Sequence, residues 1–250
     1  MSAKTILPSS WEVPEVFHSR LGKSAGRQRT MSHEGHLLII LHDVPEPGVP
    51  ERTGVFFWRN PQAEWKTSVA GAGLPGLKEL LERYAKAIDA REAELHQASS
   101  VGDLLPIRRA AVPIARSSRN VHAALQAARE AASDDRELII LRDRAYEIER
   151  AAELLLEDVK TAIDVETAEQ AELQAELAHQ VSMTAQRLNL LVGFFVPISA
   201  IASFFGMNLK NGLEEAPPGL FWVILGVGLV FGLMLRGALA KPPKPLEPKK

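Results

Sequence analysis

The tripeptide Gly206-Met207-Asn208 holds the residues of this chain whose types and spacing point most clearly to chemistry. It lies at the end of a charge-free run, 188–207, and a second such run, 216–235, follows after a short polar loop. Each run is long enough for one helix to cross the ~30 Å hydrocarbon core of a bilayer. An asparagine at the mouth of a membrane span suggests a pore entrance. The alternative is that Gly-Met-Asn only ends a helix.

The composition limits the remaining classes of function. The chain has 250 residues and a net charge of −2, so nothing global indicates nucleic-acid binding. It has no cysteine, which excludes disulfides and thiolate metal sites. Residues 1–22 contain no apolar stretch of signal-peptide length, so we expect the roughly 185 residues before the first span to stay in the cytosol as one domain.

The charges that flank the two spans predict a topology. Arg187 precedes the first span and a basic tail, 236–250, follows the second, whereas the loop 208–215 carries one lysine against Glu214 and Glu215. The positive-inside rule therefore places both termini in the cytoplasm and the loop outside. We expect the protein to lie in the inner membrane in this orientation. The two glutamates either raise the local cation concentration or are ordinary solvated loop charges.

The cytosolic domain, 1–132, begins with a part that is typical of β-structure. Residues 1–70 contain short apolar runs of strand length, among them His36–Leu41 and Thr53–Trp58, and Glu64–Ser68 resembles a return strand. These runs predict a small sheet of three or four strands.

The rest of that domain, 74–132, has helical periodicity. Apolar residues at steps of three and four predict one helix over 74–98. A second helical region covers 101–132, and we expect it to be interrupted or kinked near Pro106 and Pro113, because proline removes a helix hydrogen bond.

A long stalk helix, 133–187, follows and continues into the first span. Ser133–Asp135 has the residue types of an N-cap, and neither proline nor glycine interrupts 134–192. The helix has a heptad seam that predicts a packed bundle or a coiled coil. The seam consists of Leu138, Leu141, Ala145, Ile148, Ala152, Leu155, Val159 and Ala162.

Small and polar residues then replace the seam at the same spacing. This stripe contains Ala168, Ala171, Ala175, Ala178, Ser182 and Ala185, and it continues into the span as Asn189, Val192, Val196, Ser199 and Ser203. The stripe either lines a permeation path on the axis of a symmetric oligomer or only permits close helix packing. Pro197 either shapes that path or is a tolerated bend. Gly228 and Gly232 predict close packing of the second span against the first.

The two spans together resemble the CorA family of divalent-metal channels. The resemblance is carried by Phe194-Phe-Val-Pro-Ile198, with its mid-membrane proline, and by Phe204-Phe-Gly-Met-Asn208. The acidic outer loop, the one further span and the basic tail agree with it. It implies an α+β cytosolic domain, a long stalk helix that enters the first of two C-terminal membrane helices, and a homopentameric funnel.

In that arrangement five first spans surround the pore, and Gly206, Met207 and Asn208 form the signature at its outer mouth. Position by position, the resemblance places a set of residues along the pore, namely Ser182, Ala185, Leu188, Val196 and Ser199. Leu188 is larger than the others and is a candidate constriction on the cytosolic side.

The chemistry expected at Asn208 suits a hydrated cation. Mg²⁺ dehydrates reluctantly, so a ring of neutral amide oxygens that accept hydrogen bonds from its waters recognises the ion without trapping it. The ion is cargo, and no cofactor is implied. The chain has no phosphate loop, nucleophile elbow or zinc-protease helix, so it is not expected to be an enzyme.

Other readings stay open at this point. The cytosolic part is roughly a hundred residues shorter than in the usual magnesium transporters of the family, which leaves the regulatory metal sites unassigned. Zn²⁺, Co²⁺ or Ni²⁺ transport and a tension-responsive channel are alternatives within transport. A non-conducting, membrane-anchored oligomeric scaffold is the alternative of another class.

Overall fold

In the computed structural model, the protein is a mixed α/β chain that divides into two compact units, 1–169 and 170–250. The structure describes residues 6–22, 24–49, 51–69, 73–206, 217 and 219–239. One long helix contributes its first part to the first unit and its last part to the second. The expected α/β class with a long helix is thereby confirmed.

A four-stranded antiparallel sheet with the strand order β1-β2-β3-β4 forms one layer of the first unit. Its strands are β1 (Arg29–His33), β2 (His36–His42), β3 (Gly54–Arg59) and β4 (Trp65–Thr67). The β1–β2 hairpin turns at Glu34 and Gly35, whose φ angles are +47° and +77°. Positive φ at both central residues matches the twist of the strands, as in the usual two-residue hairpin turn.

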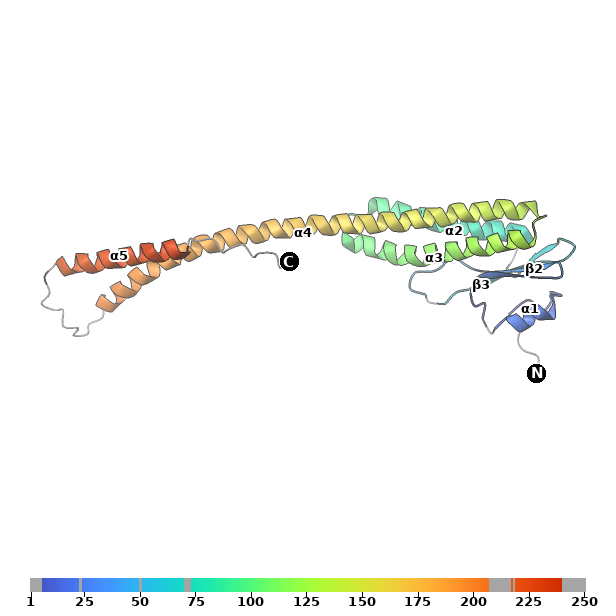
Figure 1. Cartoon of the computed structure of the whole chain (residues 1–250), viewed down its shortest axis with the longest axis horizontal. Coiled ribbons are helices and arrows are strands. Elements are labelled where there is room, and N and C mark those ends of the chain that lie inside the picture. Colours follow the sequence, from blue (N-terminus) through green and yellow to red (C-terminus); the bar gives the residue numbers. More distant parts are fainter. Residues whose placement is uncertain are drawn as a thin grey trace, which may run out of the picture. The chain divides into compact units, whose positions relative to one another are not determined.

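Both faces of the sheet are covered. Leu37, Ile39 and Phe57 point into the main core with the helices, whereas the alternate residues point to the other face, because side chains alternate along a strand. A segment before β1 covers that other face with Leu7, Trp11 and Phe17, and it includes the short helix α1 (Glu15–Arg20). Figure 1 shows α1 and the α2–α3 pair on opposite sides of the sheet.

Two helices lie along the first part of the long helix (Figure 1). They are α2 (Gly73–Gln97) and α3 (Val101–Ala131). The Oγ of Ser100 accepts the Asp103 N–H and its hydroxyl donates to the Asp103 carboxylate, at 2.7 Å, so α3 begins with a reciprocal cap. These hydrogen bonds lower the pKa of Asp103, with the Ser100 hydroxyl as the main cause.

α3 is continuous through Pro106 and Pro113, so the interruption, one of the two outcomes expected there, is not present. Each proline leaves the carbonyl four residues earlier without its helical partner, at Gly102 and Arg109. Both of those residues are exposed, so water can bind the freed oxygens. Packing of the opposite, buried face of α3 offsets the remaining cost.

The long helix α4 (Arg136–Gly206) begins where the N-cap was expected. The Asp135 carboxylate accepts the Glu137 N–H at 3.1 Å, and it also accepts the indole N–H of Trp65 at 3.2 Å. Arg59, whose side chain is 9% exposed, places its Nε 3.3 Å from the same carboxylate. One aspartate therefore caps α4 and ties it to β3 and β4.

The heptad seam of α4 is the face that enters the main core. Seven of its members, Leu138, Leu141, Ala145, Ile148, Ala152, Leu155 and Val159, are at most 3% exposed. Ala162 is half-buried. The seam is therefore the face of a helix bundle within one chain.

A buried polar cluster joins the sheet to α2 and α3. The hydroxyl of Tyr84 lies 2.6 Å from Ser117 Oγ and donates to the main-chain carbonyl of His42 at 3.1 Å. Gln28 donates to Ser117 Oγ at 2.9 Å and accepts the His42 N–H at 3.2 Å. Burial raises the pKa of Tyr84 to about 12.

Tyr84→Phe is expected to destabilise the first unit by about 1–2 kcal/mol, because it removes a buried hydroxyl and its hydrogen bonds. The control is Tyr146→Phe on the exposed side of α4, where about 0.5 kcal/mol or less is expected. Thermal unfolding in detergent, followed by near-UV circular dichroism, measures both.

Since the pKa of Tyr84 is raised by folding, its neutral form stabilises the wild type fully below pH ~10 and the benefit is lost toward pH ~12. Tyr84→Phe removes this dependence, and an unchanged alkaline profile would contradict the assignment.

The second unit contains the last part of α4 and α5 (Gly219–Leu239), which runs beside it (Figure 1). The second apolar run was predicted to begin at 216 and end at 235, so the observed helix begins three residues later and ends four residues later. Pro217 precedes α5, and its carbonyl accepts the Leu220 N–H at 2.9 Å. A proline favours the start of a helix over its interior, which explains the later beginning.

Candidate functional site

The small and polar stripe of α4 is exposed on the single chain. Each residue predicted to line a pore within the described range is accessible, namely Ser182, Ala185, Leu188, Asn189, Val192, Val196, Ser199 and Ser203. They lie on one continuous helix, so the helical repeat aligns them along one side. That they line a pore stays a prediction.

The opposite side of the same helix is taken by α5. A Cβ added to Gly232 would lie 3.1 Å from the carbonyl oxygen of Phe194, and one added to Gly228 would lie 3.2 Å from Cδ1 of Ile201. The two glycines therefore let α5 approach α4 closely, as the small-xxx-small spacing predicts.

The two faces of α4 are separated by the helical repeat. At about 100° per residue, Val192, Val196 and Ser203 lie about half a turn away from Phe194. Because α5 covers the Phe194 side, it leaves the stripe free over its whole described length. The pair of α4 and α5 therefore leaves one face of small and polar residues available for contact with a further partner.

Asn189 is the most polar member of the stripe within the apolar run. Its side chain is exposed and has no hydrogen-bond partner among the residues that the structure describes. A bare amide facing hydrocarbon is costly, so its placement favours contact with water or with another polar group. Leu188, one residue before it, is 58% exposed and lies at the flank of the stripe.

The signature tripeptide is only partly within the described residues. Gly206 is the last residue of α4. Met207 and Asn208 lie outside the described residues, as do Glu214 and Glu215 of the predicted outer loop. The described residues therefore include the stripe up to Ser203 and only the first residue of the signature.

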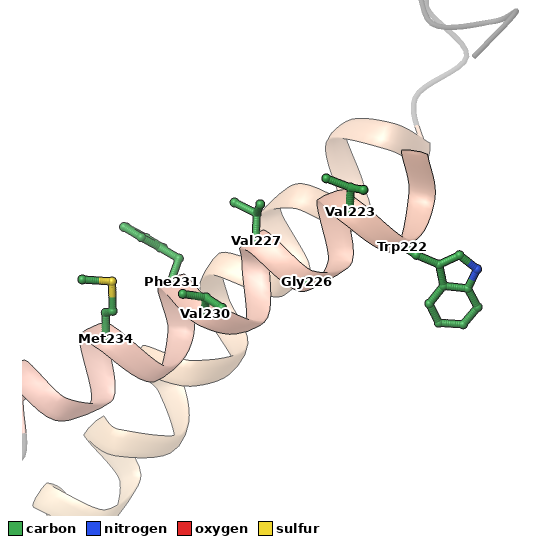
Figure 2. A pocket seen from close by; sticks show the side chains of 7 residues that line it. All are labelled: Trp222, Val223, Gly226, Val227, Val230, Phe231 and Met234. Atoms are coloured by element: carbon green, nitrogen blue, oxygen red, sulfur yellow. The ribbon is translucent and has the colours of Figure 1, made fainter. Parts of the chain in front are cut away.

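The outer face of α5 forms a shallow apolar groove of about 480 Å³. Figure 2 shows Val223, Val227, Phe231 and Met234 projecting from one side of the helix. Gly226 lies in the same groove, and a Cβ there would meet nothing within 4 Å. This uncharged face has the composition of a surface in contact with lipid.

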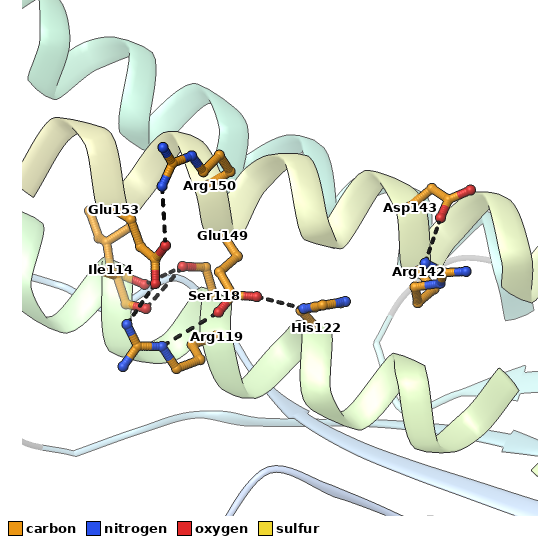
Figure 3. A network of polar contacts seen from close by, with 10 residues as sticks. Ile114, Ser118, Arg119, His122, Arg142, Asp143, Glu149, Arg150 and Glu153 are labelled. Atoms are coloured by element: carbon orange, nitrogen blue, oxygen red, sulfur yellow. Dashed lines mark hydrogen bonds and ion pairs between the residues drawn. The ribbon is translucent and has the colours of Figure 1, made fainter. Parts of the chain in front are cut away.

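A polar network between α3 and α4 was not predicted from the sequence. His122 Nδ1 donates to Glu149 at 2.5 Å, and Arg119 bonds Glu153 at 2.6 Å and approaches Glu149 at 3.4 Å (Figure 3). The hydrogen bond and charge of Glu153 raise the pKa of Arg119, so the arginine stays charged. The carboxylates of Glu149 and Glu153 therefore join α4 to α3.

No group of three or more potential ligands from His, Asp and Glu is placed to hold a metal within the described part of the chain. The stalk glutamates 147, 149, 153 and 157 form ion pairs with neighbouring basic residues. His33 and His36 are cross-strand partners at the β1–β2 turn. His36 Nδ1 accepts the indole N–H of Trp58 at 3.3 Å.

One helix among the described residues, Arg136–Ser203, contains a stretch long and apolar enough to cross a membrane. The described apolar part of α5, Gly219–Met234, is shorter. A family model described as the CorA-like Mg²⁺ transporter protein matches residues 76–236, from α2 to α5. The chain belongs to this family. The resemblance seen in the sequence is thereby confirmed.

Membership carries three general conclusions. The chain belongs to a family of membrane transporters for divalent cations, so it is a transporter rather than an enzyme. The divalent cation is the transported species, and transport requires no resident cofactor. The specific ion, the assembly and the selectivity residues are proposals.

A solved structure has a similar fold. The full-length CmaX protein is similar over 93% of this chain and 83% of its own, with a TM-score of 0.58 and 17% identity. The complete CorA magnesium transporter of Methanocaldococcus jannaschii matches 86% of this chain and 79% of its own, with 16% identity and a TM-score of 0.42. No curated protein sequence gave a significant match.

Proposed function

We propose that the chain forms a homopentameric channel of the inner membrane that passes hydrated Mg²⁺ into the cytoplasm. Five copies of the last part of α4 surround the axis, with α5 as an outer ring in contact with lipid. Residues 133–187 form the stalk, 208–215 the outer loop and 236–250 a basic cytoplasmic tail. Both termini are cytoplasmic.

The observation that carries this proposal is the division of α4 into two opposite faces. Gly228 and Gly232 of α5 are packed on the side of Phe194 and Ile201, and the stripe with Asn189 and the serines is left uncovered. A symmetric ring of such hairpins turns the uncovered face toward the axis. Small side chains there leave room for a hydrated ion, and hydroxyl and amide groups hydrogen-bond to its waters.

The second span has sufficient length for this role. The uncharged part of α5, 219–235, has 17 residues, which corresponds to about 26 Å at the helical rise per residue and lies at the short end of the range that crosses the hydrocarbon core. Its described residues before Arg236 carry no charge.

The test is metal uptake into proteoliposomes that contain the full-length protein and an ion-sensitive dye. We expect Mg²⁺ uptake above that of protein-free liposomes, driven by an inward-negative potential. Competition with Zn²⁺, Co²⁺ and Ni²⁺ then ranks the ions. Preferential uptake of one of these metals would replace Mg²⁺ as the substrate, and absence of flux for every metal would overturn the channel in favour of a scaffold.

Ser199→Leu is expected to reduce Mg²⁺ flux about threefold or more, because it adds apolar bulk to the face proposed to line the path. The control is Ala202→Leu, an exposed position that lies about 60° from Ser199 and about 120° from Val196 around the helix. Flux in proteoliposomes, at equal reconstituted oligomer, measures both variants. Equal flux in the two variants would remove the stripe from the pathway.

A further inference from the structure

A strip on α3 combines arginines with exposed apolar residues. Leu105, Arg109, Val112 and Arg116 follow one another at steps of four, three and four, so they share less than a quarter turn of the helix. Leu105 is 39% exposed and Val112 is 37% exposed. Both arginines are exposed and form no ion pair within the described residues. We call these four residues the basic strip.

A second strip with the opposite charge lies on α4 in the same unit. Leu154, Asp158, Val165 and Glu169 occupy one side of the helix, about a third of a turn from the buried seam. Leu154 is 46% exposed and Val165 is 52% exposed. Neither Asp158 nor Glu169 forms an ion pair in the described part of the chain. We call these four residues the acidic strip.

The surroundings of the strips strengthen their charges. Between 161 and 186 the chain has no lysine or arginine, so nothing on α4 neutralises the end of the acidic strip. Near the basic strip, Asp103 is occupied with the helix cap, and Arg119 has its own partners in Glu149 and Glu153. Each strip therefore presents uncompensated charge and solvent-exposed apolar side chains on a rigid helix.

We propose that the basic strip of one copy docks on the acidic strip of the next copy of this chain. The occupant follows from complementarity, since both strips alternate apolar and charged side chains with opposite signs, at steps of four, three and four on α3 and of four, seven and four on α4. Because each copy offers one strip to each of two neighbours, the contact is head-to-tail, and it generates a ring when the repeated rotation closes. The inference rests on the oligomeric channel proposed above, and it assigns the cytosolic contact between neighbours.

Cross-linking tests the contact, because the natural chain has no cysteine. Arg109→Cys and Asp158→Cys are placed in separate full-length chains with different tags, coexpressed, and treated with a bifunctional maleimide. We expect a covalent dimer that carries both tags, and no dimer from either variant alone. Asp89→Cys, exposed on α2, replaces Arg109→Cys as the control and gives no product. Dimers of one variant with itself, or an oligomer without the mixed product, would overturn the proposal.

Exchanging the charges of the two strips gives a second test, because a folding defect would not be repaired by combining the two sets of changes. Arg109→Glu with Arg116→Glu is expected to reduce the oligomeric fraction in detergent at least about fivefold, and Asp158→Lys with Glu169→Lys likewise. The four changes together restore the oligomer. If the arginine variant keeps its oligomer and instead loses binding to phosphatidylglycerol vesicles, the strip binds a membrane surface and the proposal is wrong. Asn208→Ala leaves the cross-link intact, so failure of conduction is distinguishable from failure of this contact.

Discussion

Asn208→Ala is expected to reduce Mg²⁺ flux about tenfold or more, because it removes the amide oxygens that we propose form a ring and bind the waters of the ion's hydration shell. Mg²⁺ holds its waters tightly, so an entrance that accepts hydrogen bonds from those waters selects the ion without dehydrating it. Alanine has no acceptor and leaves the waters unmatched. The neutral side chain carries no charge, so the loss is one of recognition rather than of electrostatic attraction.

The matched control is Asn211→Ala, which removes the same amide three residues later in the loop. Uptake in proteoliposomes is compared at equal amounts of reconstituted oligomer, determined by light scattering. We expect Asn211→Ala to retain flux within about twofold of the wild type, because position 211 lies beyond the signature. Equal flux in wild type and Asn208→Ala would remove the central claim for the signature.

Gly232→Leu is expected to separate the two helices of the second unit. A Cβ at this position would lie 3.1 Å from the main-chain oxygen of Phe194 and 3.3 Å from its ring. A backbone oxygen cannot rotate away as a side chain does, so α5 must move outward. Overpacking of this kind costs about 1–3 kcal/mol, and a leucine that prevents close contact along a whole helix lies at the upper end.

Gly226→Leu is the control on the same helix. A Cβ at Gly226 meets nothing within 4 Å, and both substitutions raise helix propensity by a similar amount, about 1 kcal/mol. The difference between the two variants therefore isolates packing. Gly228→Leu is expected to lie between them, because its nearest contact is the flexible end of Ile201 at 3.2 Å. Thermal unfolding and size-exclusion profiles in detergent give the order, and equal stability of all three would contradict the helix pairing.

Periodicity alone predicted the buried face of α4 and the two central strands of the sheet. The heptad of α4 predicted a buried face, and its seven members from Leu138 to Val159 are in the core, because a helix in water must bury its apolar side. The apolar runs at His36 and Thr53 coincide with β2 and β3 for the same reason. The resemblance to the CorA family also depends only on local residue types, and the family model confirms the family.

The short and mostly polar elements β1 and α1 had no such periodicity. β1 has only Met31 buried and α1 only Phe17, so neither shows a period. Their positions follow from pairing with β2 and from cover of the outer sheet face by Trp11 and its neighbours, which are long-range contacts. The periodicity of a sequence indicates which residues are buried, but it does not indicate which residues they contact.

The same distinction between local periodicity and long-range contact applies to the candidate site. Spacing showed that the stripe from Ser182 to Ser203 shares one side of a helix, because 3.6 residues per turn is a property of every α-helix. Which side α5 covers depends on close approach at Gly228 and Gly232, and that became visible only with both helices in place. The pairing of His122 and Arg119 with Glu149 likewise joins residues that are far apart in the chain. Local geometry follows from the backbone repeat, whereas the choice of partner follows from packing, which no local pattern contains.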